Sequence, residues 1–336
     1  MNMKAIRLHR TGGPEVLQLD EINRPEPGPG EVLIKTHSIG VGIPDELIRD
    51  GRYPWMPSLP TIPGIEMSGQ VEALGDGVNQ HKIGDPVVVS VIPTRSCYAE
   101  YLAVDADWAF PCSANIDLAD AACLTNYRVA HRILRTAARV RAGESVLIIG
   151  AAGGLGSALV QLANDADLVS IALVRGDTKV AFARELGADH VIDSRTEDVS
   201  ARIMEITGNQ GVDFILDPVG GDQFVGQLDL LAPVGTLILY GIIDGLPTDD
   251  VFAAQCKRWG RSPAVRMFSI HSYDERRDDT ARDLAMLMEK IGEGRIKPAI
   301  FATLPLAAAE EAHVQLQDGK VLGKIILQPD LKKEKT

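Results

Sequence analysis

The feature that most constrains the fold is a run in the middle of the chain, residues 145–163, which reads SVLIIGAAGGLGSALVQLA. It predicts an apolar strand, a tight glycine-rich turn and an amphipathic helix, in that order. A dinucleotide-binding βαβ unit has this order, because the free N–H groups at the start of the helix receive the charge of a phosphate. We expect Gly153 to let the backbone approach a pyrophosphate and Gly156 to let the helix pack closely on the strand. Ala151 stands where the usual Gly-x-Gly-x-x-Gly pattern begins, and it fits the turn if its φ stays negative.

The next strand bears on which dinucleotide is bound. It is expected over 169–174 and ends at Arg175, with Lys179 about one helical turn later. An NAD site places a carboxylate at this strand end for the ribose 2′-hydroxyl, whereas an NADP site places cations there for the 2′-phosphate. Asp177 comes two residues too late for the carboxylate role in an ordinary turn. The residues therefore favour NADPH, the alternative being that both cations are solvated surface charges.

The alternation of strands and helices continues to about residue 241. Apolar runs at 190–193, 212–217 and 235–241 predict further strands, with a helix from the turn at 218–221 through Leu231. This alternation is typical of a parallel, doubly wound α/β sheet, which binds ligands outside the carboxyl ends of its strands. By position alone, this cofactor edge contains Asp217, Tyr240, Gly241 and Ile242.

The first third of the chain has a different pattern. It is rich in glycine and proline, and its short apolar runs at 32–35, 69–74 and 85–90 predict an antiparallel, barrel-like domain. A long connection, 45–63, contains Tyr53. Connections of this length usually have a function or are disordered.

The last part of the chain predicts a strand over 265–270, an amphipathic helix over 280–293 and a final strand over 323–327. The dinucleotide-binding domain is therefore expected to be inserted within a second domain that both ends of the chain build. The expected domains are 123–266 for dinucleotide binding, and 1–122 with 267–336 for the second domain.

A series of short motifs carries a family resemblance. In order along the chain they are MKAI at 3–6, PEPGPGEV at 25–32, DELIRDGRYP at 45–54, PGIEMSG at 63–69, YAEY at 98–101, AAGGLG at 151–156, LGAD at 186–189 and GK at 323–324. On these motifs the chain resembles a medium-chain dehydrogenase/reductase of the zinc-free quinone oxidoreductase and enoyl reductase branch. The resemblance spans nearly the whole chain. It implies a GroES-like β-barrel-type catalytic domain and a Rossmann doubly wound parallel sheet.

A branch of this family that binds zinc shares the fold, so a zinc site in this chain has to be considered. A catalytic zinc needs three protein ligands. The resemblance places one of them, a cysteine, near Gly42 and another, a histidine, at Ile65, so two of the three ligands are missing. We therefore expect no metal, and alcohol oxidation, which uses zinc to form an alkoxide, is disfavoured. A structural zinc lobe is not expected either, because the four cysteines have no close spacing: Cys97, Cys112, Cys123 and Cys256.

In place of a metal, the resemblance points to Tyr53. The tyrosine of this motif in similar enoyl reductases is thought to hydrogen-bond the substrate carbonyl or to donate the proton, and a phenol is a neutral donor at pH 7. The alternative is an aromatic lid that only packs on the substrate. The family usually carries an asparagine near the nicotinamide where this chain has Gly42, and His37 or Thr125 could replace it.

The segment 267–273 is similar to a Phe-Trp-Leu stretch that lines the enoyl reductase pocket, although it lacks the tryptophan. Phe268 and Ile270 are expected to flank the nicotinamide. His271 is either a polar pocket residue or a structural histidine, and the structural role is favoured.

The resemblance implies a reductase that passes hydride from NADPH to a quinone or to the β-carbon of an α,β-unsaturated carbonyl. The alternative acceptor is an enoyl thioester, for which Arg258, Arg261 and Arg266 could form a basic rim. A second class is a non-catalytic NADPH-binding protein. A homodimer is implied, through the edge of the dinucleotide sheet near 235–241. The predicted cofactor-binding residues are Thr125, Ala152, Gly153, Gly154, Leu155, Gly156, Arg175, Lys179, Arg195, Asp217, Tyr240, Gly241, Phe268, Ile270 and Lys324.

Composition sets the remaining expectations. The 336 residues suffice for two domains, and the net charge of −12 disfavours nonspecific binding to nucleic acid. We find no apolar run of transmembrane length and no amino-terminal signal peptide. The chain has only four cysteines, and their spacing indicates no disulfide framework, which suits a reducing cytoplasm. The expected partner is a small-molecule substrate, with neither nucleic acid nor membrane.

Overall fold

The computed structural model of the protein describes residues 1–90 and 96–331. They pack as two compact units, the first made of Met1–Arg128 with the chain from His271 onward, and the second of Val129–Ile270. The second unit is thus inserted in the chain between two parts of the first. Its boundaries fall a few residues beyond those expected from the sequence. Within residues 1–90 and 96–331, no helix is both long and apolar enough to cross a bilayer.

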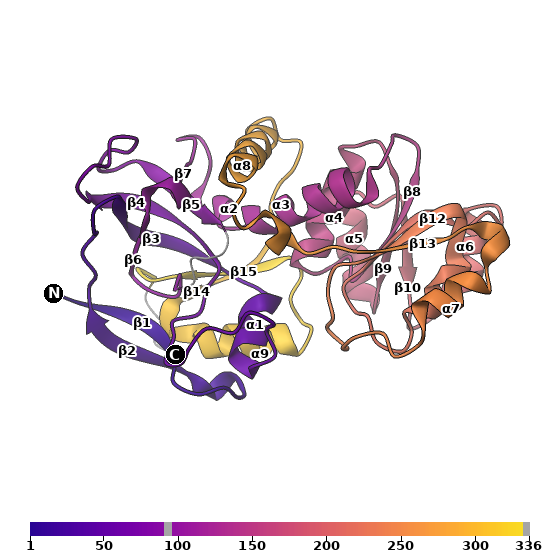
Figure 1. Ribbon diagram of the computed structural model, residues 1–336, viewed down its shortest axis with the longest axis horizontal. Coiled ribbons are helices and arrows are strands. Elements are labelled where there is room, and N and C mark those ends of the chain that lie inside the picture. Colours follow the sequence, from indigo (N-terminus) through magenta and orange to yellow (C-terminus); the bar gives the residue numbers. More distant parts are fainter. Residues whose placement is uncertain (91–95, 332–336) are drawn as a thin grey trace. The chain divides into compact units, whose positions relative to one another are not determined.

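The second unit is a six-stranded parallel sheet whose strands alternate with helices (Figure 1). The strand order is β10-β9-β8-β11-β12-β13, which is the Rossmann order, with the chain reversing direction across the sheet between β8 and β11. Its elements are β8 (Ser145–Ile149), α4 (Gly154–Asn164), β9 (Val169–Val174), α5 (Asp177–Glu185), β10 (His190–Asp193), α6 (Val199–Ile206), β11 (Val212–Asp217), β12 (Leu231–Leu239), α7 (Val251–Cys256) and β13 (Ala264–Met267).

Local chemistry explains these elements. The central strands are buried on both faces, as in most parallel sheets, and they are rich in valine, isoleucine and leucine. Asp198 caps α6 by accepting a hydrogen bond from the amide of Ala201 at 3.0 Å, and Asp250 caps α7 in the same way at Ala253, at 2.9 Å. Such caps satisfy amides that have no partner inside the helix.

Two expectations about this sheet are corrected. The helix expected through Leu231 is absent; short 3₁₀ turns cover Val225–Leu230, and β12 already begins at Leu231 because this residue pairs with Val212. The strand expected over 265–270 covers only Ala264–Met267, and it is the sixth strand of the parallel sheet, not the start of the other domain.

The second correction changes the expected dimer edge. The segment near 235–241 lies inside the sheet, because β12 pairs with β11 on one side and with β13 on the other. The edge strands are β10 and β13.

The first unit is a mostly antiparallel sheet of order β14-β15-β3-β4-β5-β7, with β6 also paired to β3, together with a β1-β2 hairpin. The inward side chains form one core that includes Leu8, Ile34, Met67 and Leu327. The expected GroES-like sheet domain is confirmed. Its elements are β1 (Asn2–Leu8), β2 (Leu17–Asn23), β3 (Glu31–Val41), α1 (Ile43–Asp50), β4 (Glu66–Leu74), β5 (Pro86–Ser90), β6 (Tyr101–Asp105), β7 (Phe110–Pro111), α2 (Leu118–Ala121), α8 (Arg277–Gly292), β14 (Ile300–Pro305), α9 (Ala309–Gln317) and β15 (Lys324–Gln328), while α3 (Leu124–Arg132) contains the boundary residue Arg128.

Candidate functional site

The glycine-rich turn joins β8 to α4 in the second unit. Gly150 has a φ of +70°, so it takes the left-handed position, and Ala151 keeps a negative φ as expected. Gly153 then caps α4 in extended backbone, with a φ of −79° and a ψ of 177°. A Cβ on Gly156 would lie 2.2 Å from the carbonyl oxygen of Gly150, so only glycine allows this approach of helix and turn. The packing role expected of Gly156 is confirmed.

Gly153 differs from Gly156 in this respect. A Cβ on Gly153 would meet only the carbonyl oxygen of Gly150, at an ordinary distance of 3.5 Å. Packing within the protein therefore does not require glycine here. Gly153, Gly154 and Leu155 are only partly buried, and the first amides of a helix have no acceptor inside it. This turn fits a bound pyrophosphate, which would use the open space and the amides.

A basic corner lies at the carboxyl ends of β9 and β10. Gly176, which caps α5, has a φ of +96°, and a Cβ there would lie 3.2 Å from Nη1 of Arg195. Arg175 precedes Gly176, and Lys179 is in the first turn of α5. The structure therefore brings Arg195 to the segment that carries the two predicted cations.

The carboxylate of Asp193, which ends β10 at this corner, is already used by the backbone. Its Oδ1 accepts hydrogen bonds from the amides of Gly176 at 2.8 Å and of Arg195 at 2.9 Å. These two amides hold the pKa of Asp193 below its ordinary value. The side chain is 5% exposed, so it folds the corner and is poorly placed to accept from a ribose hydroxyl.

The turn after β11 is built around Asp217. This buried carboxylate accepts from the amide of Val219 at 2.5 Å and from Nε2 of Gln227 at 2.7 Å. Burial raises the pKa of Asp217, against the effect of these donors. A Cβ on Gly241 would lie 2.5 Å from the carbonyl oxygen of Pro218, so glycine lets the segments after β11 and β12 approach each other.

The other residues predicted in the second unit are placed as follows. Tyr240 follows β12, is half-buried, and donates its amide proton to the carbonyl of Asp217 at 2.9 Å. Phe268 and Ile270 follow β13 and are half-buried, and the amide of Phe268 donates to the carbonyl of Leu239 at 2.9 Å. They lie beyond the carboxyl ends of their strands, as the fold requires of cofactor residues.

The three arginines considered as a basic rim for a thioester all bind groups of the protein itself. Arg258 binds both carboxylate oxygens of Asp229, at 2.7 and 2.6 Å. Arg261 donates to the carbonyl of Leu231, and Arg266 donates to the carbonyl of Ala137 at 2.9 Å. These three guanidiniums stabilise the second unit itself.

Tyr53 lies in the first unit, in the segment after α1. Its side chain is 7% exposed, and Oη is 2.7 Å from Nε2 of His271. Nδ1 of His271 is in turn 2.8 Å from Oδ2 of Asp274. The ring of Trp55 lies over the imidazole, with a centroid distance of 3.8 Å and an interplanar angle of 33°. The phenol is therefore held in a polar cluster with His271 and Asp274.

A buried charged cluster surrounds the position of the missing asparagine. Nζ of Lys324 donates to Oε1 of Glu66, and both side chains are buried. A Cβ on Gly42 would lie 3.4 Å from Nζ of Lys324. Asp45, also buried, accepts from the amide of Gly42 at 2.9 Å. Burial raises the pKa of Asp45 to about 7, against the opposing effect of Lys324.

The pKa of Lys324 is raised, because Glu66 outweighs the burial that would lower it. Thr125, another predicted cofactor residue, is 5% exposed, and its Oγ1 is 2.8 Å from Oγ of Ser90. His37 is exposed and its Nδ1 lies 2.9 Å from Oγ of Ser38. Lys324 and Thr125 are thus engaged with neighbours inside the first unit.

The positions expected for zinc ligands are occupied by residues that do not bind metals. Gly42 precedes α1, and Ile65, before β4, is 6% exposed within the core. Among the described residues, no three His, Cys, Asp or Glu side chains are grouped to hold a metal ion. Cys97, Cys112 and Cys123 are buried thiols and Cys256 is an exposed one.

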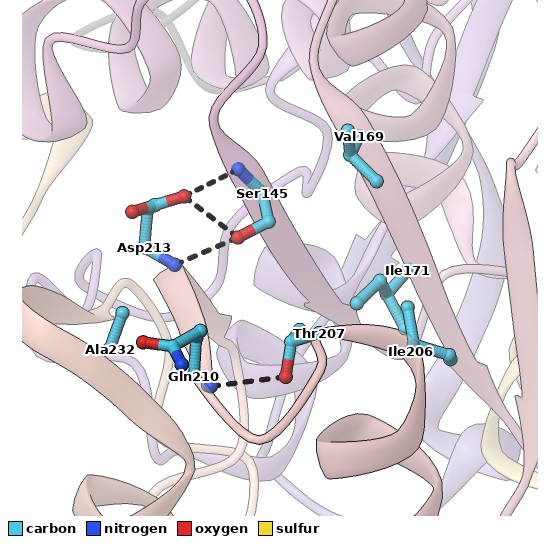
Figure 2. Close-up of a pocket in the computed structure, with 9 residues that line it drawn as sticks. Ser145, Val169, Ile171, Ile206, Thr207, Gln210, Asp213 and Ala232 are labelled. Atoms are coloured by element: carbon cyan, nitrogen blue, oxygen red, sulfur yellow. Dashed lines mark hydrogen bonds between the residues drawn. The ribbon is translucent and has the colours of Figure 1, made fainter.

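A cavity of about 290 Å³ lies at the amino ends of the parallel strands, opposite the carboxyl ends where the cofactor is expected (Figure 2). It is lined where β8, β9 and β11 begin, and there the hydroxyl and amide of Ser145 both donate to Oδ2 of Asp213, at 2.8 and 2.7 Å. Its position at the amino ends of the strands separates it from the cofactor edge. We therefore do not place the cofactor in this cavity.

Sequence reasoning missed two groups of residues. Asp193, at the end of β10, builds the turn after that strand through backbone amides, a role that the sequence analysis did not assign to it. Asp217 was predicted at this edge by its position, but its bonds to the turn after β11 were not predicted. Asp274 and Trp55 were not predicted to join His271 and Tyr53. Each lies close in the sequence to one of them, but Tyr53 and His271 are 218 positions apart, and no spacing rule brings them together.

Comparisons with known proteins agree with this geometry. Residues 28–114 match the family model of the alcohol dehydrogenase GroES-like domain, and residues 186–327 match that of the zinc-binding dehydrogenase. Quinone oxidoreductase of Rattus norvegicus is 32% identical over 331 residues, which cover 97% of this chain and 97% of that protein. The 2-haloacrylate reductase of Burkholderia sp is 29% identical over 334 residues, covering 98% and 99%. The crystal structure of Escherichia coli quinone oxidoreductase complexed with NADPH has a TM-score of 0.91 and 31% identity, and covers 97% of this chain and 100% of that one.

Proposed function

The chain belongs to the medium-chain dehydrogenase/reductase superfamily, in the branch of the quinone oxidoreductases, and from this premise we propose that it reduces a conjugated acceptor with NADPH. The acceptor is a quinone or an α,β-unsaturated carbonyl. Both classes accept hydride at one end of a conjugated system and a proton afterwards. The observation that carries the proposal is the glycine-rich turn, in which Gly156 is required by packing whereas Gly153 leaves space for a ligand.

The preference for NADPH rests on the corner after β9 and β10. Arg195 lies next to Gly176, Arg175 and Lys179 flank the same glycine in the sequence, and Asp193 is bonded to backbone amides. Two guanidiniums suit a 2′-phosphate, because each can bind it through two parallel hydrogen bonds. The similar quinone oxidoreductase of Escherichia coli forms a complex with NADPH, which supports the same preference.

When bound, the nicotinamide supplies the hydride, and the protein supplies position and hydrogen bonding. The amides that begin α4 would hold the pyrophosphate, and Asp217, Tyr240, Gly241, Phe268 and Ile270 would border the rest of the dinucleotide. Tyr53 would donate a hydrogen bond to the carbonyl of the acceptor, since its hydroxyl belongs to a polar cluster. We also place Thr125 and Lys324 beside the cofactor, as the family resemblance implies.

Several observations support this class of acceptor. We propose a reaction without zinc, because Gly42 and Ile65 provide no metal-binding side chain. The name of the Burkholderia relative, a 2-haloacrylate reductase, describes an acceptor with a conjugated double bond. A large enoyl thioester is disfavoured, because Arg258, Arg261 and Arg266 are engaged within the second unit.

We propose that two copies associate through the free edge of β13. Met267 on this strand is 73% exposed, and a second copy of the same edge strand would complete its hydrogen bonding. We also propose a cytoplasmic location, because the four cysteines are free thiols.

The test is oxidation of NADPH and of NADH with 1,4-benzoquinone, 9,10-phenanthrenequinone, a short enone and crotonyl-CoA. We expect turnover of a quinone or the enone with NADPH, and a KM for NADPH raised at least about tenfold in Arg175→Ala and in Arg195→Ala, with little change for NADH. Arg184→Ala is the matched control, because Arg184 is an exposed cation in the last turn of α5.

Two outcomes would contradict the proposal. Equal effects of Arg175→Ala and Arg184→Ala on both nucleotides would remove the argument for NADPH. Tight binding of NADPH without turnover of any acceptor would favour a non-catalytic NADPH-binding protein.

A further inference from the structure

Tyr53, His271 and Asp274 form a continuous hydrogen-bonded chain within the first unit. Oη of Tyr53 lies 2.7 Å from Nε2 of His271, and Nδ1 of the same ring lies 2.8 Å from Oδ2 of Asp274. The phenol follows α1, whereas the imidazole and the carboxylate precede α8. The three groups meet through tertiary packing, and the order of their atoms matches a path for a proton.

The carboxylate fixes the direction of one hydrogen bond, and the protonation state of the imidazole fixes the other. An ionised Asp274 only accepts, so Nδ1 of His271 carries hydrogen and donates to it. With a neutral imidazole, Nε2 is an acceptor and takes the hydroxyl hydrogen of Tyr53. With an imidazolium, Nε2 donates to Oη, and the hydroxyl hydrogen of Tyr53 is released toward another acceptor. Protonation of His271 therefore reverses the bond that it makes to the phenol.

Two side chains lie against the imidazole of His271. Asp274 contributes a carboxylate whose other oxygen, Oδ1, is buried without a hydrogen-bond partner among the described residues. The indole of Trp55 lies on the imidazole at 3.8 Å, and an aromatic face attracts a cation. Arg52, which precedes Tyr53 in the sequence, binds Asp50 at 2.8 Å.

We propose that His271, held by Asp274, supplies the proton that Tyr53 passes to the reduced acceptor; this inference rests on the function proposed above. Hydride addition turns the acceptor into an enolate or a hydroquinone anion. The O–H bond of Tyr53 breaks as its proton moves to that anion, and the Nε2–H bond of His271 breaks as Oη takes the proton. His271 then recovers a proton from solvent. The balance is one acceptor, one NADPH and one proton consumed for one reduced acceptor and one NADP⁺.

In this scheme Tyr53 is the catalytic residue, and His271 and Asp274 are positioning residues that act through it. The test is the dependence of kcat on pH, from about pH 5.5 to about pH 9, with NADPH and the best acceptor of the panel. The variants are Tyr53→Phe, His271→Gln and Asp274→Asn. His9→Gln is the matched control, because His9 also binds an aspartate, Asp20, at 2.8 Å, but on the exposed hairpin.

The wild-type kcat is expected to fall as pH rises and His271 loses its proton. We expect His271→Gln to lower kcat by about 10- to 100-fold near pH 6, to change it little near pH 9, and to leave KM within about threefold. Asp274→Asn also lowers kcat near pH 6, because an amide holds the imidazole less firmly at Nδ1 than the carboxylate does. Tyr53→Phe lowers kcat by about 100-fold across the range, and His9→Gln follows the wild type.

Binding of NADPH, measured by fluorescence, shows that each variant still folds. A His271→Gln enzyme with the wild-type pH profile overturns the proton path and leaves the reductase assignment intact. A wild-type protein that binds NADPH but reduces no acceptor overturns the proposed function, and the proton path with it. The two failures are therefore distinguishable.

Discussion

Gly156 faces the carbonyl oxygen of Gly150 so closely that a Cβ at position 156 would lie 2.2 Å from that oxygen. It would also lie 2.7 Å from Cα of Ala151. Both contacts are with backbone, which cannot rotate away as a side chain can. The helix that carries the candidate phosphate site can therefore pack this closely on the turn only because position 156 has no Cβ.

We expect Gly156→Ala to lower the free energy of unfolding by about 1–3 kcal/mol, the usual cost of forcing extra volume into a packed interior. Denaturant unfolding of the variant and the wild type measures this difference. Unchanged stability would mean that α4 and the turn can move apart freely.

Gly153→Ala separates ligand binding from packing. Its backbone is extended and its Cβ would meet one atom at 3.5 Å, so the stability should be unchanged or about 0.4–1 kcal/mol higher. The methyl group would stand in the space proposed for the pyrophosphate, and we expect the Kd for NADPH to rise about tenfold or more. Titration by fluorescence gives the Kd, and unaltered binding would place the phosphate elsewhere.

Asp45 makes the free energy of unfolding fall as pH rises from acid to neutral. Burial raises its pKa in the folded state to about 7, from an ordinary value of 3.8. Folding therefore favours the protonated acid, so this stabilisation is complete below pH 3.8 and is lost as pH rises through about 7. In Asp45→Asn, whose amide oxygen can still accept from Gly42, the free energy of unfolding should fall less between about pH 5 and pH 8, by an amount on the order of 1 kcal/mol. Parallel curves for the two proteins would contradict this.

His313 acts in the opposite direction. It is buried between Arg49, whose Nη1 is 3.4 Å from Nδ1, and Tyr98, whose Oη is 3.2 Å from Nε2. Burial, together with Arg49, lowers its pKa from 6.5 to about 3. Its contribution to stability is present above pH 6.5 and is lost as pH falls toward about 3.

We expect His313→Gln to lose less stability than the wild type when both are unfolded with denaturant at about pH 6.5 and about pH 4, by on the order of 1 kcal/mol. Both proteins also lose stability from carboxylates in acid, so the difference between them is the measurement. A larger loss in the variant would mean that His313 does not destabilise the folded protein in acid.

Met267→Lys tests the proposed dimer. The amide of Phe268 donates to β12, so the alternation along the strand turns the amide of Met267 outward. A lysine at this exposed edge would meet its own copy across a two-fold axis, and edge charges oppose strand pairing. Light scattering after size exclusion should give twice the chain mass for the wild type and a lighter average for Met267→Lys. A monomeric wild type would remove the proposal.

The glycine-rich turn, the helix after it and the parallel sheet could all be predicted from the amino-acid sequence. These depend on neighbours along the chain: an apolar strand followed by glycines and an amphipathic helix leaves few alternatives. The negative φ that an alanine at position 151 needs is also found, while Gly150 takes the left-handed position. The expected helix through Leu231 was wrong because β12 begins there, and the pairing of Leu231 with Val212 is not visible in the local pattern.

Contacts between distant residues depend on how the elements pack, and the sequence does not reveal them. The four residues 264–267 carry no pattern that identifies their partner strand. The sequence therefore could not show that β13 pairs with β12 and forms an edge of the sheet. Nor could it show that Arg195 reaches Gly176, or that the phenol of Tyr53 meets His271 across 218 positions. Local periodicity is set by backbone geometry within a few residues, whereas such contacts form only when whole elements pack and exclude water.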